Sequence, residues 1–202
     1  MPAEIQIDLP YPAQLSRAHL LVRLLVAIML GGLTKGIGGW PGGVLYLALP
    51  AVAAILISQH GAVRYLGSDG PKVVRVLDWI LGFLAYMALL TDEFPSKQSR
   101  VRYDFVPSGS PTVGSAVLRI FTSIPAAIVI ALVGFVAAIL GFLQMVSVLL
   151  VGHYPRSWFE FQCGMLRIQA RLYGYHASLT ETYPTFSFHG TATLPPAQVT
   201  AG

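Results

Sequence analysis

Long apolar stretches separated by short polar segments dominate the chain. The first apolar stretch covers about 15–33 and a shorter one covers about 44–58, with a glycine-rich loop that carries Lys35 between them. A helix needs about 20 apolar residues to cross a bilayer. We therefore predict a hairpin of two membrane spans here, with the second span kinked or interrupted at Pro50.

A further apolar run, residues 113–150, is too long for a single span. It contains Gly134 near its middle and Arg119 early in its first part. The length predicts a second helical hairpin, with spans at about 113–132 and 135–151 and a tight turn near Gly134.

Each predicted hairpin is followed by a helix that mixes charged and aromatic residues, at 73–90 and at 157–178. Charged side chains are costly at the centre of a bilayer. We therefore predict that both helices lie in the membrane interface, with a membrane-spanning 73–90 as the alternative.

Helix 157–178 has the most ordered pattern, because its polar residues fall on one stripe and its apolar residues on the opposite face. The arginines of this stripe could contact lipid phosphates or a partner, or Glu160 could pair with Arg156 and Arg167 and fix the helix within the fold. The glycine of the stripe suggests close approach of another backbone. The stripe consists of Arg156, Glu160, Gly164, Arg167 and Arg171.

The two halves of the chain repeat one another. Both interfacial helices end in the same signature, Leu-Thr-acid-x-aromatic-Pro. Aligning the signatures superposes Leu77 on Leu166, Tyr86 on Tyr175 and Ala88 on Ala177. We predict tandem modules at 1–106 and 113–189, a linker at 107–112 and a disordered tail at 190–202.

The signature residues have two interpretations. Short polar residues followed by proline are typical of a turn that stops a helix, which makes them architectural. Carboxylates near a membrane could instead serve a catalytic or proton-relay role. The residues are Thr91, Asp92 and Pro95 in the first copy and Thr180, Glu181 and Pro184 in the second.

Arg23 and Arg119 occupy matching places early in the two modules. They could extend to the lipid headgroups, as long basic side chains near helix ends do. Alternatively they could pair with acids of the other module, such as Asp78 or Glu160.

Three short segments alternate apolar and polar residues, at 4–9, 100–106 and 185–189. We expect them to pair into a small cytoplasmic sheet. The predicted fold class is an all-α integral membrane protein of two tandem modules, each a two-span hairpin plus an amphipathic interfacial helix, with short cytoplasmic β-strands.

Composition supports a membrane location. Of 202 residues, 54% are hydrophobic and 11% are charged, against about 25% charged in a typical soluble domain. The thirteen Lys and Arg residues lie mostly at the ends of apolar segments, which fits anionic headgroups better than nucleic acid. Since only Lys35 falls in a far-side loop, the positive-inside bias places both termini in the cytoplasm.

Candidate chemistry is sparse. A lone cysteine, Cys163, excludes an intrachain disulfide, and no two of the five histidines are four residues apart. Phosphate-binding, haem-attachment and nucleophile motifs are missing from the sequence. We therefore expect no cofactor, no metal and no enzymatic activity.

The second half of the chain resembles a bacterial membrane family known as domain of unknown function 4389. The shared pattern is G-x-Y-P-R, F-x-F, G-x-x-R, then an aromatic residue and L-T-D-x-Y-P-P-F, found here between Gly152 and Phe186. Departures are Glu181 for the usual Asp and Thr185 for the second Pro. The first half keeps only Arg23 and 90–95, as a degenerate copy. The resemblance implies a small bacterial multi-span protein and supplies no activity.

Three functions follow as hypotheses. The leading one is a non-enzymatic accessory, scaffold or lipid-organising subunit of an envelope complex in the bacterial inner membrane, with lipids and another membrane protein or a second copy as partners. An alternative is a small transporter or channel component that acts as an oligomer. The third is a membrane enzyme acting on lipid through Asp92 or Glu181 with Arg167 and Arg171.

Overall fold

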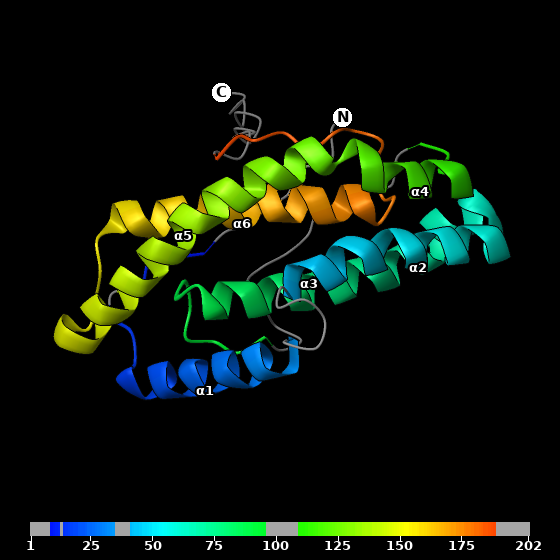
Figure 1. Cartoon of the computed structure of the whole chain (residues 1–202). Coiled ribbons are helices and arrows are strands. Elements are labelled where there is room, and N and C mark those ends of the chain that lie inside the picture. Colours follow the sequence, from blue (N-terminus) through cyan, green and yellow to red (C-terminus); the bar gives the residue numbers. More distant parts are fainter. Residues whose placement is uncertain (1–8, 13, 35–40, 96–108, 189–202) are drawn as a thin grey trace, which may run out of the picture.

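The computed structural model describes residues 9–12, 14–34, 41–95 and 109–188, and within these ranges all regular structure is helical. Figure 1 shows an elongated arrangement in which helices from both halves lie beside one another. The helices are α1 (Arg17–Thr34), α2 (Pro41–Arg64), η2 (Tyr65–Asp69), α3 (Gly70–Met87), α4 (Val113–Thr122), α5 (Ile124–Val151) and α6 (Arg156–His176).

In the first half, the chain runs to one end of the molecule in α2, turns through the π-helical η2 and returns in α3 (Figure 1). Pro50 lies inside α2 without ending it, so the expected interruption there is wrong. The helical geometry is broken instead at Gly61, whose φ of 76° is in the left-handed region that glycine tolerates best.

In the second half, α4 and α5 follow one another almost directly. A reciprocal capping box between Thr112 and Ser115 starts α4, and the break between the helices falls at Ser123. Pro125 stands in the first turn of α5, where its missing N–H removes no helical hydrogen bond.

The turn expected near Gly134 is wrong, because α5 continues through this residue to Val151. A single glycine weakens a helix by only about 1 kcal/mol, too little to reverse an otherwise apolar helical segment. Residues 113–132 and 135–151 therefore form no hairpin with each other.

The first predicted hairpin, 15–33 with 44–58, is also not formed. Instead α1 packs against α5, and α2 packs against α4. The first long helices of each half thus pair with a helix of the other half. An Arg17 Nη2–Leu150 O hydrogen bond of 3.2 Å joins the start of α1 to the end of α5.

The helix expected in the interface at 157–178 is the most enclosed element. α6 packs against α2, α3, α4 and α5, and most of its residues from Phe159 to His176 are buried. The main core contains Leu77 and Leu81 of α3 together with Leu166 and Ala170 of α6. The amphipathic pattern of 157–178 therefore belongs to a helix that packs against several neighbours and has one polar stripe.

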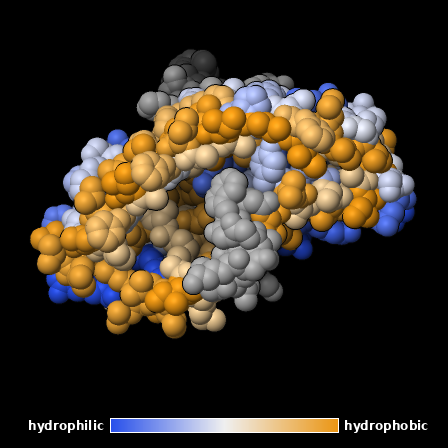
Figure 2. Space-filling model, viewed as in Figure 1, coloured by the Kyte–Doolittle hydropathy of each residue, from blue (hydrophilic) through white to orange (hydrophobic). Residues whose placement is uncertain are grey.

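Outside this core, the long helices expose apolar side chains (Figure 2). Two helical segments of the described residues are long and apolar enough to cross a membrane, Val44–Met87 and Ile124–Val151. In each, 17% of the most apolar window is buried inside the protein. Val44–Met87 is α2, η2 and α3 together.

The predicted strand at 185–189 is not formed by its described part, because residues 185–188 have no regular secondary structure. Arginines of α6 bind the carbonyls of Ser187 and Phe188, so these acceptors are satisfied without a sheet. The strands predicted at 4–9 and 100–106 and the tail at 190–202 lie wholly or almost wholly outside the described residues.

Replacing Gly134 by proline tests the continuity of α5. Proline removes a helical hydrogen bond and clashes with the preceding turn, so Gly134→Pro should lower the free energy of unfolding by about 3 kcal/mol. Gly134→Ala is the matched control, because an added Cβ meets only the flexible end of Met165 at 3.4 Å. Unfolding in mild detergent, followed by circular dichroism, measures both. Equal stability of the two variants would contradict a continuous α5 and support the turn predicted near Gly134.

Candidate functional site: two arginine-capped helix ends

Helices α3 and α6 end in the same hydrogen-bonded turn. After α3, the Leu90 N–H donates to Ala85 O at 3.0 Å and the Leu89 N–H to Tyr86 O at 3.2 Å. After α6, the corresponding bonds run from Leu179 to Gly174 O at 3.1 Å and from Ser178 to Tyr175 O at 3.0 Å. Both are Schellman turns, which satisfy the last helical carbonyls.

The residue at the bend of each turn is not the usual glycine. Leu89 has a φ of 62° and Ser178 a φ of 54°, both in the left-handed region. This conformation costs a side-chain-bearing residue roughly 1–2 kcal/mol. Both residues are buried, so the surrounding packing holds each turn in a strained state.

Arg23 of α1 caps the end of α3. Its Nε donates to Tyr86 O at 2.7 Å, and its Nη2 donates to Thr91 O at 2.6 Å and to Asp92 Oδ1 at 3.0 Å. The guanidinium lies 4.3 Å from the centre of the Tyr86 ring. A cation at a helix C-terminus also interacts favourably with the helix dipole.

Arg119 of α4 caps the end of α6 in the same way. Its Nη1 donates to Tyr175 O and to Thr180 O, both at 2.6 Å, and its guanidinium lies 4.7 Å from the Tyr175 ring centre. Arg23 and Arg119 are each 5% exposed. They therefore do not extend to the surface. The sequence suggested pairing with Asp78 or Glu160 as an alternative, and neither arginine forms such a pair.

The acid of each signature accepts a hydrogen bond from the segment that precedes the first helix of the same half. Asp92 Oδ2 accepts from the Ser16 N–H at 2.7 Å, and Glu181 Oε1 accepts from the Ser110 N–H at 3.0 Å. Gly109, with φ 96°, leaves no room for a side chain, because an added Cβ would lie 2.3 Å from the Glu181 carboxyl.

The other signature residues complete the turns. The Thr91 hydroxyl accepts from the Glu93 N–H, and the Thr180 hydroxyl accepts from the Thr182 N–H, both at 3.1 Å. The two prolines that follow, Pro95 and Pro184, are buried. These contacts are architectural in character.

Two buried tyrosines, which were not among the site residues predicted from the sequence, bind the same turns from the opposite half. The Tyr65 hydroxyl donates to Ala177 O, and the Tyr154 hydroxyl donates to Leu89 O at 2.7 Å. Burial raises the pKa of Tyr154. A signal was present in the sequence, since Tyr65 and Tyr154 stand at the same separation along the chain as Tyr86 and Tyr175.

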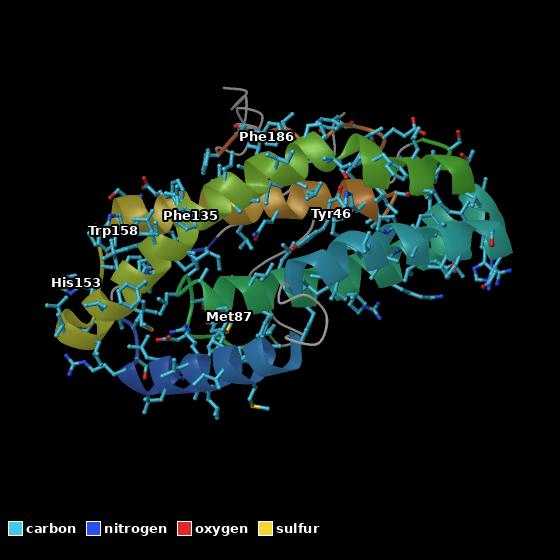
Figure 3. All side chains as sticks on the ribbon, viewed as in Figure 1. Tyr46, Met87, Phe135, His153, Trp158 and Phe186 are labelled. Carbon is cyan, nitrogen blue, oxygen red and sulfur yellow. The ribbon has the colours of Figure 1, made fainter. Side chains whose placement is uncertain are left out.

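A polar cluster centred on His176 lies beside the second turn. His176, fully buried, contacts Tyr46 O at 3.1 Å through Nδ1 and Ser123 Oγ at 2.6 Å through Nε2. The Tyr46 hydroxyl donates to Ile120 O at 2.7 Å. Burial lowers the pKa of His176 to about 4, so the ring is neutral at pH 7. The cluster joins α2 and α6 at the break between α4 and α5 (Tyr46 is labelled in Figure 3).

The polar stripe of α6 divides into two parts. Arg156 and Glu160 form an exposed ion pair, 2.9 Å between Nε and Oε1. Arg167 donates to Phe188 O at 3.1 Å, and Arg171 donates to Ser187 O and Thr185 O. The arginines therefore hold the segment that follows the second turn, and only the Arg156–Glu160 part of the expected pairing is seen.

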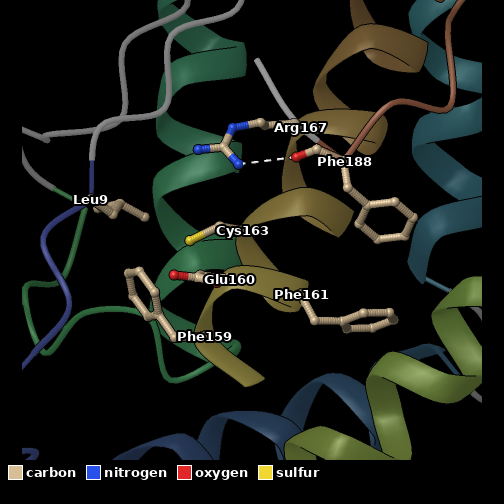
Figure 4. Close-up of a pocket in the computed structure, with 7 residues that line it drawn as sticks. All are labelled: Leu9, Phe159, Glu160, Phe161, Cys163, Arg167 and Phe188. Carbon is tan, nitrogen blue, oxygen red and sulfur yellow. Dashed lines mark hydrogen bonds between the residues drawn. The ribbon is translucent and has the colours of Figure 1, made fainter. Parts of the chain in front are cut away.

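The close approach expected at Gly164 comes from a side chain and not from a backbone. An added Cβ at Gly164 would lie 2.2 Å from Cδ1 of Phe188. A pocket of about 320 Å³ lies beside this contact (Figure 4). Burial raises the pKa of the Cys163 thiol, which lines the pocket, to about 11, so the thiol is protonated at pH 7 and a poor nucleophile. The pocket is lined by Leu9, Phe159, Glu160, Phe161, Cys163, Arg167 and Phe188.

The hydrogen bonds of this site join helices and connecting segments to one another. Asp92 and Glu181 accept hydrogen bonds from backbone N–H groups. Arg167 and Arg171, which the lipid-enzyme hypothesis placed with them, bind carbonyls of residues 187 and 188. Within the described ranges, no three residues of the types His, Cys, Asp and Glu come together as a metal site.

Comparison with known proteins gives one match. A model of the family described as "Domain of unknown function (DUF4389)" matches residues 114–187. This confirms the resemblance for the second half, and the matched stretch contains Arg119, the turn after α6 and the segment held by Arg171. The first half lies outside the match. No curated protein and no solved structure matches the chain.

Arg119→Lys tests the arginine cap. Lysine keeps the charge but lacks the planar guanidinium, so it cannot serve Tyr175 O, Thr180 O and the Tyr175 ring together. Leaving buried carbonyls unsatisfied should lower the free energy of unfolding by roughly 2–3 kcal/mol. Arg156→Lys, at an exposed pair, should change it by less than about 0.5 kcal/mol. Denaturant unfolding in detergent measures both, and equal losses would refute the cap.

A comparison at Ser178 tests the strain in the turn. Both Ser178→Ala and Ser178→Gly remove a buried hydroxyl that has no hydrogen-bond partner in the described part of the protein. Only glycine also relieves the left-handed backbone, so Ser178→Gly should be more stable than Ser178→Ala by about 1 kcal/mol. Thermal unfolding of the two variants gives the difference. A glycine variant no more stable than the alanine variant would show that the turn is unstrained.

Proposed function

We propose that this protein is a multi-span, non-enzymatic membrane protein that acts as an accessory, scaffold or lipid-organising subunit of an envelope complex. The proposal places it in the bacterial inner membrane with both termini on the cytoplasmic side. Its two halves are copies of one module in this proposal. Membrane lipids and either another membrane protein or a second copy of the chain are its partners.

The observation that carries the proposal is the outward-facing apolar surface of α5. The core helix of a soluble protein can be equally apolar, but it is mostly buried, whereas α5 presents most of its circumference to the outside. Exposed apolar patches of this extent are typical of surfaces covered by lipid or a partner. Its most exposed large residues are Leu132, Phe135, Phe142 and Leu150, each more than 60% exposed (Phe135 is labelled in Figure 3).

Helix α1 supports the same conclusion. Leu21 and Met29 are 71% and 66% exposed, and Leu25 and Ile28 are also largely exposed. In contrast, Arg23 on the same helix is buried. Apart from the exposed Arg17 at its first residue, the helix therefore has apolar residues outside and its charge inside, which is the reverse of a helix on a water-soluble protein and suits a lipid environment.

The use of the charged residues favours a scaffold over an enzyme. The buried arginines serve as helix caps, and the signature acids bind Ser16 and Ser110 N–H groups. The sites that could have carried chemistry thus build a rigid frame. The cytoplasmic placement of both termini rests on the distribution of Lys and Arg along the sequence.

Charge introduced on the outer face of α5 tests the membrane location. Leu132→Arg with Phe135→Arg should sharply reduce recovery in the alkali-resistant membrane fraction, because each arginine costs about 2.5–3.5 kcal/mol at the centre of a spanning helix. Ser157→Arg with Thr182→Arg, at exposed polar positions, is the matched control and should leave recovery unchanged. Membrane fractionation and immunoblotting give the readout.

The opposite pattern would exclude the membrane assignment. If the Leu132 and Phe135 substitutions increased the amount of soluble, folded protein, the face would be exposed to water. The scaffold role has its own readout, native mass spectrometry after mild detergent extraction. We expect retained lipid, a second copy or another subunit, and a bare single chain would contradict it.

A further inference from the structure

We infer that the two halves bind each other as reciprocal partners, each supplying a buried tyrosine to the other's capped helix end. The surface of the domain at 114–187 is therefore a docking surface for a module of its own kind. In this chain the first half occupies it. The inference goes beyond the proposed function, since it does not depend on where the protein resides.

The tyrosine contacts cross between the halves in both directions. Tyr65, at the start of η2, donates to Ala177 O after α6, and Tyr154, just before α6, donates to Leu89 O after α3. Tyr65 is 0% exposed and Tyr154 is 2% exposed. Two equivalent donors that reach neighbouring positions of two equivalent turns are expected of a pair related by approximate two-fold symmetry.

Helix packing follows the same exchange. The first helix of each half lies against the long helix of the other half, α1 on α5 and α4 on α2. The last helices, α3 and α6, pack on each other. An interface of this type is approximately isologous, because corresponding helices of each half are used on both sides, although α6 also packs on α2 without a comparable contact of α3 on α5 among the described residues.

The interactions across the interface differ in kind from those within each half. The ion pairs found among the described residues, including Arg23–Asp92 and Arg156–Glu160, each join residues of one half. Across the interface lie a shared apolar core and mainly neutral hydrogen bonds, such as Leu15 N–H to Gly152 O at 3.0 Å, together with the exposed bond from Arg17 to Leu150 O. Such an interior resembles a permanent subunit interface more than a transient one.

A glycine with positive φ precedes the tyrosine in each half. Gly61, with φ 76°, interrupts α2 shortly before Tyr65, and Gly152, with φ 83°, ends α5 shortly before Tyr154. Each positive φ lets the chain leave the helix and place the tyrosine against the opposite turn. The docking contact is thus produced by matching local geometry in both halves.

Cleavage of the full chain between the halves tests the inference. A protease site is inserted within residues 96–108, the purified protein in mild detergent is cut, and association is followed by affinity capture through a tag on one half. We expect the halves to stay together. Tyr65→Phe and Tyr154→Phe should each raise the dissociation constant about fivefold, because each removes one buried hydrogen bond.

Tyr175→Phe is the matched control. Its hydroxyl contacts Thr122 Oγ1 at 3.0 Å within the same half, so its loss should leave the association of the halves unchanged. The uncut variants are compared by circular dichroism, so that misfolding is not mistaken for dissociation. Halves that separate on cleavage of the unmodified protein, or a Tyr175→Phe variant that dissociates as readily as the other two, would overturn the inference. Neither result bears on membrane insertion, which the arginine substitutions on α5 test.

Discussion

One constraint underlies this structure, which is that two buried guanidinium groups need hydrogen-bond acceptors. Removing such a charge from water costs several kcal/mol unless it is fully bonded. Arg23 and Arg119 find most of their acceptors at the end of a helix, where carbonyls are left without a helical partner, although Nη1 of Arg23 has no hydrogen-bond partner among the described residues. Each arginine joins the first helix of its half to the last. The two caps therefore fix α1 against the end of α3 and α4 against the end of α6.

The tyrosine contacts depend on these caps. At each turn the arginine binds two carbonyls, and a different carbonyl, that of Leu89 or Ala177, accepts from a tyrosine hydroxyl of the other half. Buried carbonyls need a partner. Each half thus presents a carbonyl that a tyrosine of the other half satisfies. The arginine cap within each half forms the turn to which the other half binds.

The sequence predicted local features well and their spatial partners poorly. Periodicity indicated helices close to α3 and α6, and the repeated signature identified both turns. It could not tell that Arg23 would bind Tyr86 O, because backbone acceptors leave no mark in residue types. The turn at Gly134 failed because length alone suggested it, without a proline or polar residue to break α5. The polar stripe of α6 was misread because arginines facing lipid and arginines holding residues 185–188 give the same pattern.

Differences between the halves show where function is best sought. The capped turn is present in both, whereas the His176–Ser123–Tyr46 cluster, which takes His176 and Ser123 from the second half and Tyr46 from the first, has Met87 where the counterpart of His176 would be expected in the first half. A frame retained in both halves is required for the pairing itself. The buried neutral histidine makes a contact between the halves, to Tyr46 O, that has no counterpart at Met87 among the described residues. The family match covers the half that contains His176, which makes the second module the part of the pair where a role beyond architecture is to be looked for.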